Sequence, residues 1–331
     1  MRLASFRVEG WDRIGFELEE GRLVDMAEAM RFAGGEAAKY APADMLALIR
    51  AGESGLAAVR DLHARAHESR AALRSYGSDE ITWQAPVPSP SKVVCLALNN
   101  RALDAIKIRA PSDHPAFFLK PSTAVTGHRH PIRLRASFGL THPEPELGVV
   151  IGRTLSDVSP AAAIAGVFGY TIVNDVTSVG MREEDSFSVR YFKPGRTVGE
   201  VTVGEAHTTY PGRYKASDTF APMGPFLVTC DEIPDPAALR IECRLDEKLV
   251  ASDHTRNYVW GVADALAHIS RTMTLLPGDV VSMGTAVGGD ADDPDAPDVP
   301  GVTRANLVGF DGTVSITISR LGTLRNSIQM I

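Results

Sequence analysis

The chain has 331 residues, enough for two domains or for one large domain with an appendage. Its composition is that of a globular protein, with 44% hydrophobic and 23% charged residues. The 34 lysines and arginines are outnumbered by 41 aspartates and glutamates, and a net charge of −7 leaves no basic surface for a nucleic-acid backbone. No apolar run reaches the roughly 18 residues that a membrane span needs, and the first residues lack a secretory apolar stretch. We therefore expect a cytoplasmic protein with no nucleic-acid or membrane partner.

Three cysteines, Cys95, Cys230 and Cys243, lie far apart in the sequence without a CxxC pair. Neither a disulfide framework nor a zinc ribbon is indicated by this spacing. Each cysteine lies in an apolar run, which favours the interpretation of a small buried hydrophobic side chain.

Residues 1–80 are expected to form a small α+β domain. Alternating runs separated by glycine predict strands over residues 3–8, 13–18 and 22–26. Two helices should follow: one starts with Pro42 in its first turn and stops near Gly52, and the next covers residues 56–66. Residues 81–91 contain closely spaced prolines, which continue neither a helix nor a central strand, so they are predicted to be a linker.

Residues 92–331 are rich in strand patterns and are expected to form one domain. Apolar or alternating runs predict strands over residues 92–98, 117–119, 147–151, 170–173, 241–245 and 314–318. Helices are fewer: one begins at Ser159 and Pro160, and a longer one runs from Val262 to Met273. This balance predicts an α+β fold with a mixed sheet. Residues 186–212 and 288–300 lack clear periodicity and are predicted to be loops.

The segment 142–152 carries the most chemical information. Residues two apart on a strand face the same side, so Glu144 and Glu146 are expected to direct both carboxylates into one pocket. Two like charges that close repel each other unless a positive group lies between them, and divalent magnesium, manganese and calcium all prefer oxygen ligands. A solvated strand face is the alternative, but the segment continues directly into an apolar run, which favours a metal site.

Two further charged residues, Asp175 and Lys215, are candidates for the same site as the two glutamates. Asp175 ends the next strand in an Asn-Asp pair, which alone would indicate only a turn. Lys215 stands in a segment rich in small residues, where it would alone be an ordinary surface charge. Near a carboxylate cluster, a lysine can pair with the acids or bind an anionic substrate.

In their order along the chain, these blocks resemble the fumarylacetoacetate hydrolase superfamily over about residues 92–331. The matching blocks are residues 92–99, 118–121, 144–146, 169–175, 215–225, 255, 276–280 and 284–285. Such an ordered series is far more specific than any single motif. Residues 1–80 look like the small N-terminal domain that many longer members carry.

The resemblance implies a mixed β-sheet roll around a metal site, usually in a homodimer. Glu144, Glu146 and Asp175 fall on the family's three metal carboxylates, and Lys215 falls on its active-site lysine. The family's metal is commonly magnesium or manganese. Its substrates are mostly 2-oxo acids or 1,3-dicarbonyl acids from the breakdown of aromatic compounds or amino acids. Its reactions include C–C bond hydrolysis, keto–enol isomerisation and decarboxylation.

Substrate-binding residues are also implied by the resemblance. Lys120, Thr255 and Thr285 stand in matching blocks and are expected to contact the substrate. The arginine and glutamine that contact the substrate in the family fall on Val179 and Arg182, so the usual substrate clamp is absent. Arg182 remains a candidate ligand for a substrate carboxylate, because a guanidinium can bind a carboxylate through two parallel hydrogen bonds.

The sequence departs from hydrolytic family members in a segment that resembles their mobile lid. Those members carry a histidine–glutamate pair there, whereas Leu103 stands at the histidine's position and Ile106 replaces a polar residue. Leucine cannot take a proton from water, so the water-activating dyad is missing. Replacement general bases are a carboxylate one turn along the lid or one of three histidines: Asp104, His128, His130 and His142. His142 shares the alternation of the glutamates and could reach the metal's surroundings.

Two classes of function follow. The first is a metal-dependent enzyme acting on a small 2-oxo or 1,3-dicarbonyl acid, in which isomerisation, decarboxylation or dehydration is favoured over hydrolysis. The second is a non-catalytic metal-binding member that has lost turnover. The intact carboxylates and Lys215 favour the enzyme. Residues 186–212, between Asp175 and Lys215, are expected to roof the site or to join a dimer contact.

Overall fold

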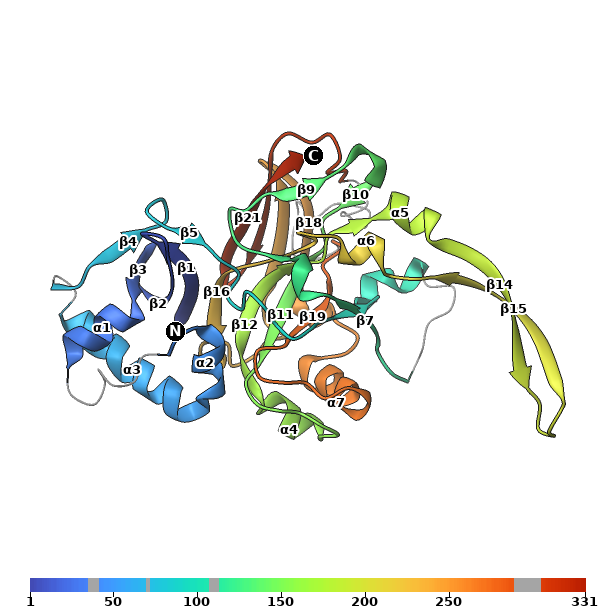
Figure 1. Ribbon diagram of the computed structural model, residues 1–331, viewed down its shortest axis with the longest axis horizontal. Helices are drawn as coiled ribbons and strands as arrows, with labels where there is room; N and C mark the ends of the chain where they lie inside the picture. Colours follow the sequence, from blue (N-terminus) through green and yellow to red (C-terminus); the bar gives the residue numbers. More distant parts are fainter. Residues whose placement is uncertain (35–41, 70–71, 107–112, 289–304) are drawn as a thin grey trace.

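A twelve-stranded mixed sheet extends through most of the molecule (Figure 1). The computed structural model describes residues 1–34, 42–69, 72–106, 113–288 and 305–331. The main path of the sheet is, in order, β4 (Ser75–Gly77), β3 (Arg22–Asp25), β2 (Trp11–Glu19), β1 (Arg2–Val8), β16 (Ala221–Thr229), β12 (Val167–Asn174), β11 (Pro145–Ile151), β19 (Val280–Thr285), β6 (Val93–Ala97) and β7 (Ala116–Lys120). β5 (Thr82–Trp83) pairs with β1, and β8 (Val125–Thr126) pairs with β16. This architecture confirms the predicted α+β class.

A second sheet of five strands covers part of one face of the large sheet. Its order is β18 (Lys248–His254), β17 (Arg240–Leu245), β20 (Thr313–Ile318), β21 (Gly322–Met330) and β9 (Ile132–Leu134). β17 and β20 approach β11 and β12. The core between the sheets extends to α4 (Pro160–Ile164) and α7 (Val262–Thr272), which pack against each other. The other face of the large sheet packs against α1 (Met26–Ala33), α2 (Met45–Arg50) and α3 (Gly52–Glu68).

β11 and β12 are buried along their whole length. Their apolar runs are suited to strands covered on both faces. Val149 faces the core between the sheets, and Val150 faces the core under the helices. Because the two strands are antiparallel with Pro145 opposite Asn174, the start of β11 lies beside the end of β12. Any polar group at this position is therefore held by a rigid, buried frame.

Short elements surround this end of the strands. They are η3 (Arg101–Ile106), η4 (Ser122–Ala124), η5 (Ala136–Phe138), β10 (Thr141–His142), β13 (Thr177–Ser178), α5 (Val179–Glu184), α6 (Arg213–Ala216) and η7 (Thr255–Asn257). The remaining short element, η6 (Cys230–Glu232), follows β16 at the opposite end, beside the start of β12. β10 pairs with β13, so residues 141–142 lie against residues 177–178.

Most of the predicted helices are present with adjusted ends. α3, α4 and α7 lie where they were expected, with Ser159 capping α4. The helix expected from Pro42 begins at Met45 instead, because the carboxylate of Asp44 accepts the Ala47 N–H at 2.7 Å. α1 was not predicted.

The prediction of a loop over residues 186–212 is wrong. β14 (Ser186–Pro194) and β15 (Val201–Thr209) form a β-hairpin that projects from the body (Figure 1). Glycine, threonine and charged residues interrupt the alternation of apolar and polar residues, so the sequence pattern does not indicate either strand. Of the other predicted loop, 288–300, only Gly288 lies within the described residues.

The N-terminal strands are continuous with the rest of the large sheet, because β1 pairs with β16 through Arg2–Val228 and Leu3–Leu227. The domain boundaries expected at residues 80 and 92 stay a prediction. Within the described part of the chain, no helix has the length and apolar character to cross a membrane. The cytoplasmic location also stays a prediction.

Candidate metal centre

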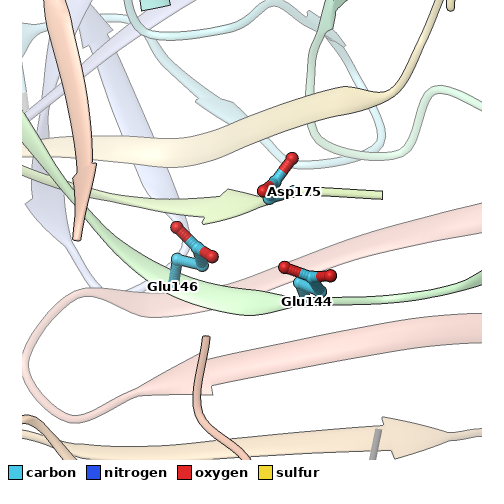
Figure 2. A group of neighbouring side chains, drawn as sticks. All are labelled: Glu144, Glu146 and Asp175. Atoms are coloured by element: carbon cyan, nitrogen blue, oxygen red, sulfur yellow. The ribbon is translucent and has the colours of Figure 1, made fainter. Parts of the chain in front are cut away.

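Three carboxylates converge where β11 and β12 meet (Figure 2). The Asp175 N–H donates to the Glu144 carbonyl oxygen at 2.9 Å, and the Glu144 N–H donates to Oδ1 of Asn174 at 3.0 Å. These two bonds connect the segments that carry Glu144 and Asp175. One carboxylate oxygen each from Glu144, Glu146 and Asp175 lies within 4.8 Å of the other two. The structure thus brings together the three acids that the sequence selected.

Glu146 is the most deeply buried of the three glutamate and aspartate side chains. Its Oε2 accepts hydrogen bonds from Ser282 Oγ at 2.5 Å and from the Gly284 N–H at 3.0 Å. Its Oε1 is buried without a hydrogen-bond partner among the described residues. Burial, followed by the charges of Asp175 and Glu144, raises the pKa of Glu146 well above its usual range. An ionised Glu146 therefore needs a positive group at Oε1.

A bulge in β19 supplies the donors to Glu146. The register between β11 and β19 shifts after Glu146, so that β19 carries an extra residue there. Gly284 has φ +102°, and a Cβ at this position would lie 2.9 Å from Cβ of Asn99. Only glycine fits this conformation and this close approach, which together aim the Gly284 N–H at the carboxylate.

Two lysines compensate Asp175. Lys120 Nζ lies 2.5 Å from Oδ1 of Asp175, and Lys215 Nζ lies 2.7 Å from Oδ2. Burial alone would raise the pKa of Asp175, but the two ammonium groups outweigh it and hold this pKa below its usual value. Lys215 also donates to Oε2 of Glu144 at 3.0 Å, and its Nζ lies 4.9 Å from the centre of the Phe118 ring. Burial would lower the pKa of Lys215, but the carboxylates raise it above its usual value.

The charges and the donor atoms fit a hard divalent cation. Three carboxylates and two ammonium groups leave one net negative charge in a buried site. Oxygen-only donors are typical ligands of magnesium and manganese. A divalent cation would satisfy Oε1 of Glu146 and leave the site with one net positive charge, which suits an anionic substrate.

His142 and Thr177 lie beside Glu144. Thr177 Oγ1 donates to Oε1 of Glu144 at 2.7 Å, and His142 Nδ1 lies 4.0 Å from the same oxygen. Burial lowers the pKa of His142, although the neighbouring Glu144 carboxylate acts in the opposite direction. The expected place of His142 in a metal's surroundings stays a prediction. Arg182 is exposed on α5.

The structure gives Lys120 and Thr255 roles other than the expected substrate contact. Lys120 is buried, and its Nζ also donates to the carbonyl oxygens of Phe220 at 2.7 Å and Val176 at 3.2 Å. Thr255 is buried, and its hydroxyl bonds to both the N–H and the carbonyl oxygen of Leu239. These contacts give both side chains a role inside the protein, and their expected contact with a substrate stays a prediction. Lys120 holds Asp175 in place.

Two of the candidate general bases also have structural roles. His128 accepts the Arg325 N–H at 3.0 Å and packs edge-on against Trp83, and His130 Nε2 lies 2.6 Å from the Trp83 carbonyl oxygen. These contacts join β21 to the proline-rich segment. His128 and His130 are therefore withdrawn as general bases.

The remaining candidates lie on the elements around the site. Asp104 is exposed on η3, where Leu103 is only 6% exposed and belongs to the core. Thr285 is half-buried at the end of β19, opposite Glu146 in the register. The sequence did not indicate the donors Ser282 and Gly284 that bind Glu146.

The Lys120–Asp175 pair predicts a stability effect. Lys120→Met keeps the apolar stem and removes the charge, leaving Asp175 with only one ammonium partner. Breaking a buried ion pair costs about 3–5 kcal/mol, so we expect a loss of this size in the free energy of unfolding. Urea denaturation measures it, with the exposed Lys248→Met as the matched control. Equal stability of the two variants would contradict the role of Lys120.

The buried His128 predicts a dependence of stability on pH. Burial lowers the pKa of His128 to about 3, whereas an unfolded histidine titrates near 6.5. The unfolded state therefore takes up the proton first, and stability falls as the pH drops below 6.5 towards 3. At pH 5 this loss is about 2 kcal/mol.

His128→Asn retains an acceptor for the Arg325 N–H and removes the titrating group. Urea denaturation at pH 7 and pH 5 should show a smaller loss for this variant than for the wild type. The exposed His67→Asn is the control. Identical losses in all three proteins would show that His128 does not govern acid stability.

Comparison with known proteins agrees with the fold and the site. The fumarylacetoacetate (FAA) hydrolase C-terminal family model matches residues 92–329. An oxaloacetate tautomerase of Bacillus subtilis is 30% identical over 294 residues, which are 87% of each chain. A mitochondrial oxaloacetate tautomerase of Homo sapiens is 31% identical over 250 residues, which are 75% of this chain and 70% of that protein.

A solved structure shows the same architecture over the whole chain. It is a maleylpyruvate hydrolase of Sphingobium sp. SYK-6 in complex with manganese(II) and pyruvate, with a TM-score of 0.69 and 25% identity. The match covers 100% of this chain and 99% of that one. The resemblance inferred from the ordered sequence blocks is confirmed: the chain is an enzyme of the fumarylacetoacetate hydrolase family.

Proposed function

We propose that this enzyme catalyses the keto–enol tautomerisation of a small 2-oxo acid, with oxaloacetate as the first substrate to test. The observation that carries the proposal is the buried carboxylate cluster beside Lys215, in which Oε1 of Glu146 has no hydrogen-bond partner in the described part of the chain. Two relatives at 30% and 31% identity are named as oxaloacetate tautomerases, which supports the choice of substrate.

We propose magnesium or manganese as the metal, held by Glu144, Glu146 and Asp175. Oxygen-only donors accept either ion, and the maleylpyruvate hydrolase with the same fold was solved with manganese(II). A divalent cation bound here supplies the Lewis acid that polarises a 2-oxo group. Binding of the cation requires an ionised Glu146, because a protonated carboxyl group is a poor ligand.

The chain's own residues would handle the charge and the proton. Tautomerisation moves one proton between C3 and the carbonyl oxygen, so negative charge develops on that oxygen. The ammonium of Lys215 lies between Glu144 and Asp175 and would stabilise this charge. His142, 4.0 Å from Glu144, is the proposed proton carrier, and Arg182 on α5 is the proposed ligand of a substrate carboxylate.

The lid segment favours tautomerisation over hydrolysis. Hydrolysis needs a group that takes a proton from water, whereas tautomerisation consumes no water. Leu103 stands at the position of the hydrolytic histidine and is buried in the core, and its side chain can neither accept nor donate a proton. Asp104 is exposed on the same 3₁₀ helix and is the carboxylate we would test first if hydrolysis were found.

The proposed reaction can be followed by the ultraviolet absorbance of enol-oxaloacetate. We expect the enol signal to decay faster when the enzyme and magnesium are present. The rate enhancement by the enzyme should fall at least about 100-fold when a chelator is added or when Glu146 is replaced in Glu146→Gln. The exposed Glu247→Gln is the matched control and should behave as the wild type.

Parallel assays separate the alternatives. Pyruvate release from oxaloacetate reports decarboxylation, and acylpyruvate cleavage reports hydrolysis. Faster cleavage of an acylpyruvate than tautomerisation of oxaloacetate would contradict the proposed reaction. Metal binding without turnover of any of these acids would favour a non-catalytic member.

We also propose a homodimer in which the β14–β15 hairpin joins the contact. The hairpin exposes a cross-strand apolar pair, with Phe192 67% and Val203 60% exposed. A two-stranded ribbon is marginally stable alone in water, and burial against a second copy would cover this pair.

Light scattering tests the dimer. The wild type should have twice the 35.5 kDa mass of one chain, and replacing residues 189–206 by an Asn-Gly turn should give monomers. Trp11→Ser removes another exposed aromatic group and is the control. A deletion variant that stays dimeric would exclude the hairpin from the contact.

A further inference from the structure

A buried carboxylate outside the metal centre, that of Asp253, has no role in the proposed reaction. Asp253 is the penultimate residue of β18 and is 1% exposed. Its Oδ2 accepts from Asn100 Nδ2 at 2.7 Å and from the Val287 N–H at 3.0 Å. Its Oδ1 accepts from Asn257 Nδ2 at 2.6 Å and from the His254 N–H at 2.7 Å. Two donors from its own segment and two from distant segments therefore meet at one carboxylate.

Asn100 extends this network to two elements beside the site. Its Nδ2 also donates to the Thr285 carbonyl oxygen at 3.1 Å, which fixes the end of β19. Its Oδ1 accepts the Ala102 N–H at 2.9 Å, at the start of η3. The preceding Asn99 donates to the Met283 carbonyl oxygen at 2.8 Å. Two consecutive asparagines thus hold the backbone on both sides of Gly284.

The backbone that is held in this way carries a donor to the metal centre. Gly284 donates its N–H to Oε2 of Glu146 at 3.0 Å. Farther along, the Ala286 N–H donates to the Pro145 carbonyl oxygen at 2.9 Å, and the Val287 N–H donates to Asp253. The contacts of Asp253 and Asn100 therefore determine where Gly284 meets Glu146.

We infer that Asp253 is a positioning residue for the metal centre. Through Asn100 and Val287 it holds the end of β19, so that Oε2 of Glu146 stays bonded to Gly284 while Oε1 remains available to a cation. The inference rests on the proposed function, because it assigns Glu146 as a metal ligand. It concerns only the orientation of Glu146, and Asp253 itself touches neither metal nor substrate.

The variant Asp253→Asn tests this role with little change in volume. A carboxamide has one oxygen in place of two, and each oxygen of Asp253 accepts two hydrogen bonds, so two of the four N–H donors would face an NH₂ group and lose their acceptor. The end of β19 should then loosen, and Glu146 should hold a cation less well. Asn100→Ser is a second variant, which removes the Nδ2 bonds to Asp253 and to the Thr285 carbonyl oxygen.

Asp279 provides a matched control at the opposite end of β19. It is also fully buried, and it accepts from Ser91 Oγ at 2.5 Å, Lys92 Nζ at 2.5 Å and the Leu276 N–H at 2.8 Å. Asp279→Asn should lower the thermal stability without altering the contact between Gly284 and Glu146. It therefore separates a general loss of stability from a loss of positioning.

The experiment measures Mn²⁺ affinity by calorimetry below the unfolding transition, together with amide hydrogen exchange of residues 283–288 without metal. We expect Asp253→Asn to raise the Kd for Mn²⁺ about 10-fold or more, the range found for residues that orient metal ligands. Asn100→Ser should raise it less, and Asp279→Asn should leave it unchanged. Exchange of residues 283–288 should accelerate in Asp253→Asn and in Asn100→Ser.

A Kd and an exchange rate in Asp253→Asn equal to those of the wild type would overturn the inference. If Asp253→Asn does not fold, the same two measurements on Asn100→Ser decide the question. A wild-type protein that binds no Mn²⁺ would overturn the proposed function instead. The exchange rates would then still show whether Asp253 holds the backbone around Gly284.

Discussion

The burial of three carboxylates at the ends of two internal strands is the constraint on which the rest of this structure depends. Removing an unpaired charge from water is expensive, so a folded chain must surround such groups with positive charge or hydrogen-bond donors. Here Lys120 and Lys215 neutralise Asp175, and Thr177 and Lys215 bind Glu144. Of the three acids, only Glu146 keeps a buried oxygen that has neither a hydrogen bond nor an ion pair among the described residues, because Oδ1 of Asp175 is paired with Lys120. The remaining imbalance is the physical basis for a cation site.

The large sheet supplies the rigidity that this arrangement needs. β11 and β12 are covered on both faces, so the acids at their ends cannot move apart without disrupting two cores. The bulge in β19 and the strained backbone of Gly284 add a donor from a third strand. In the segment after β6, Leu103 packs in the core. The rigid sheet thus fixes the positions of the acids, whereas the reaction depends on the side chains around them.

The sequence predicted the features that arise from short-range geometry. The i and i+2 spacing of Glu144 and Glu146 indicated a shared direction, and the apolar run after them indicated a buried strand. The ordered blocks then identified the family and its α+β fold. Lys120 could not be interpreted in the same way, because an apolar strand ending in lysine does not show whether the ammonium faces substrate or a buried acid.

Other features of the structure could not be predicted because they depend on contacts or patterns that short stretches of sequence do not reveal. Both His128 and His130 bond to groups that are remote in sequence, so local patterns could not exclude them as general bases. The hairpin at residues 186–209 was missed because threonine, glycine and charged side chains mask its alternation. The role of Asp253 could not be predicted, since the donors that connect it to the site, Asn100 and Val287, come close to it only in the folded chain.

The most direct measurement is a crystal structure of the protein soaked in Mn²⁺, with anomalous scattering recorded at the manganese edge. The account predicts one strong anomalous peak in contact with oxygens of Glu144, Glu146 and Asp175, with Oε1 of Glu146 among the ligands. A well-ordered site with no peak, and with Lys215 still holding Glu144 and Asp175 as the only cation between them, would contradict it.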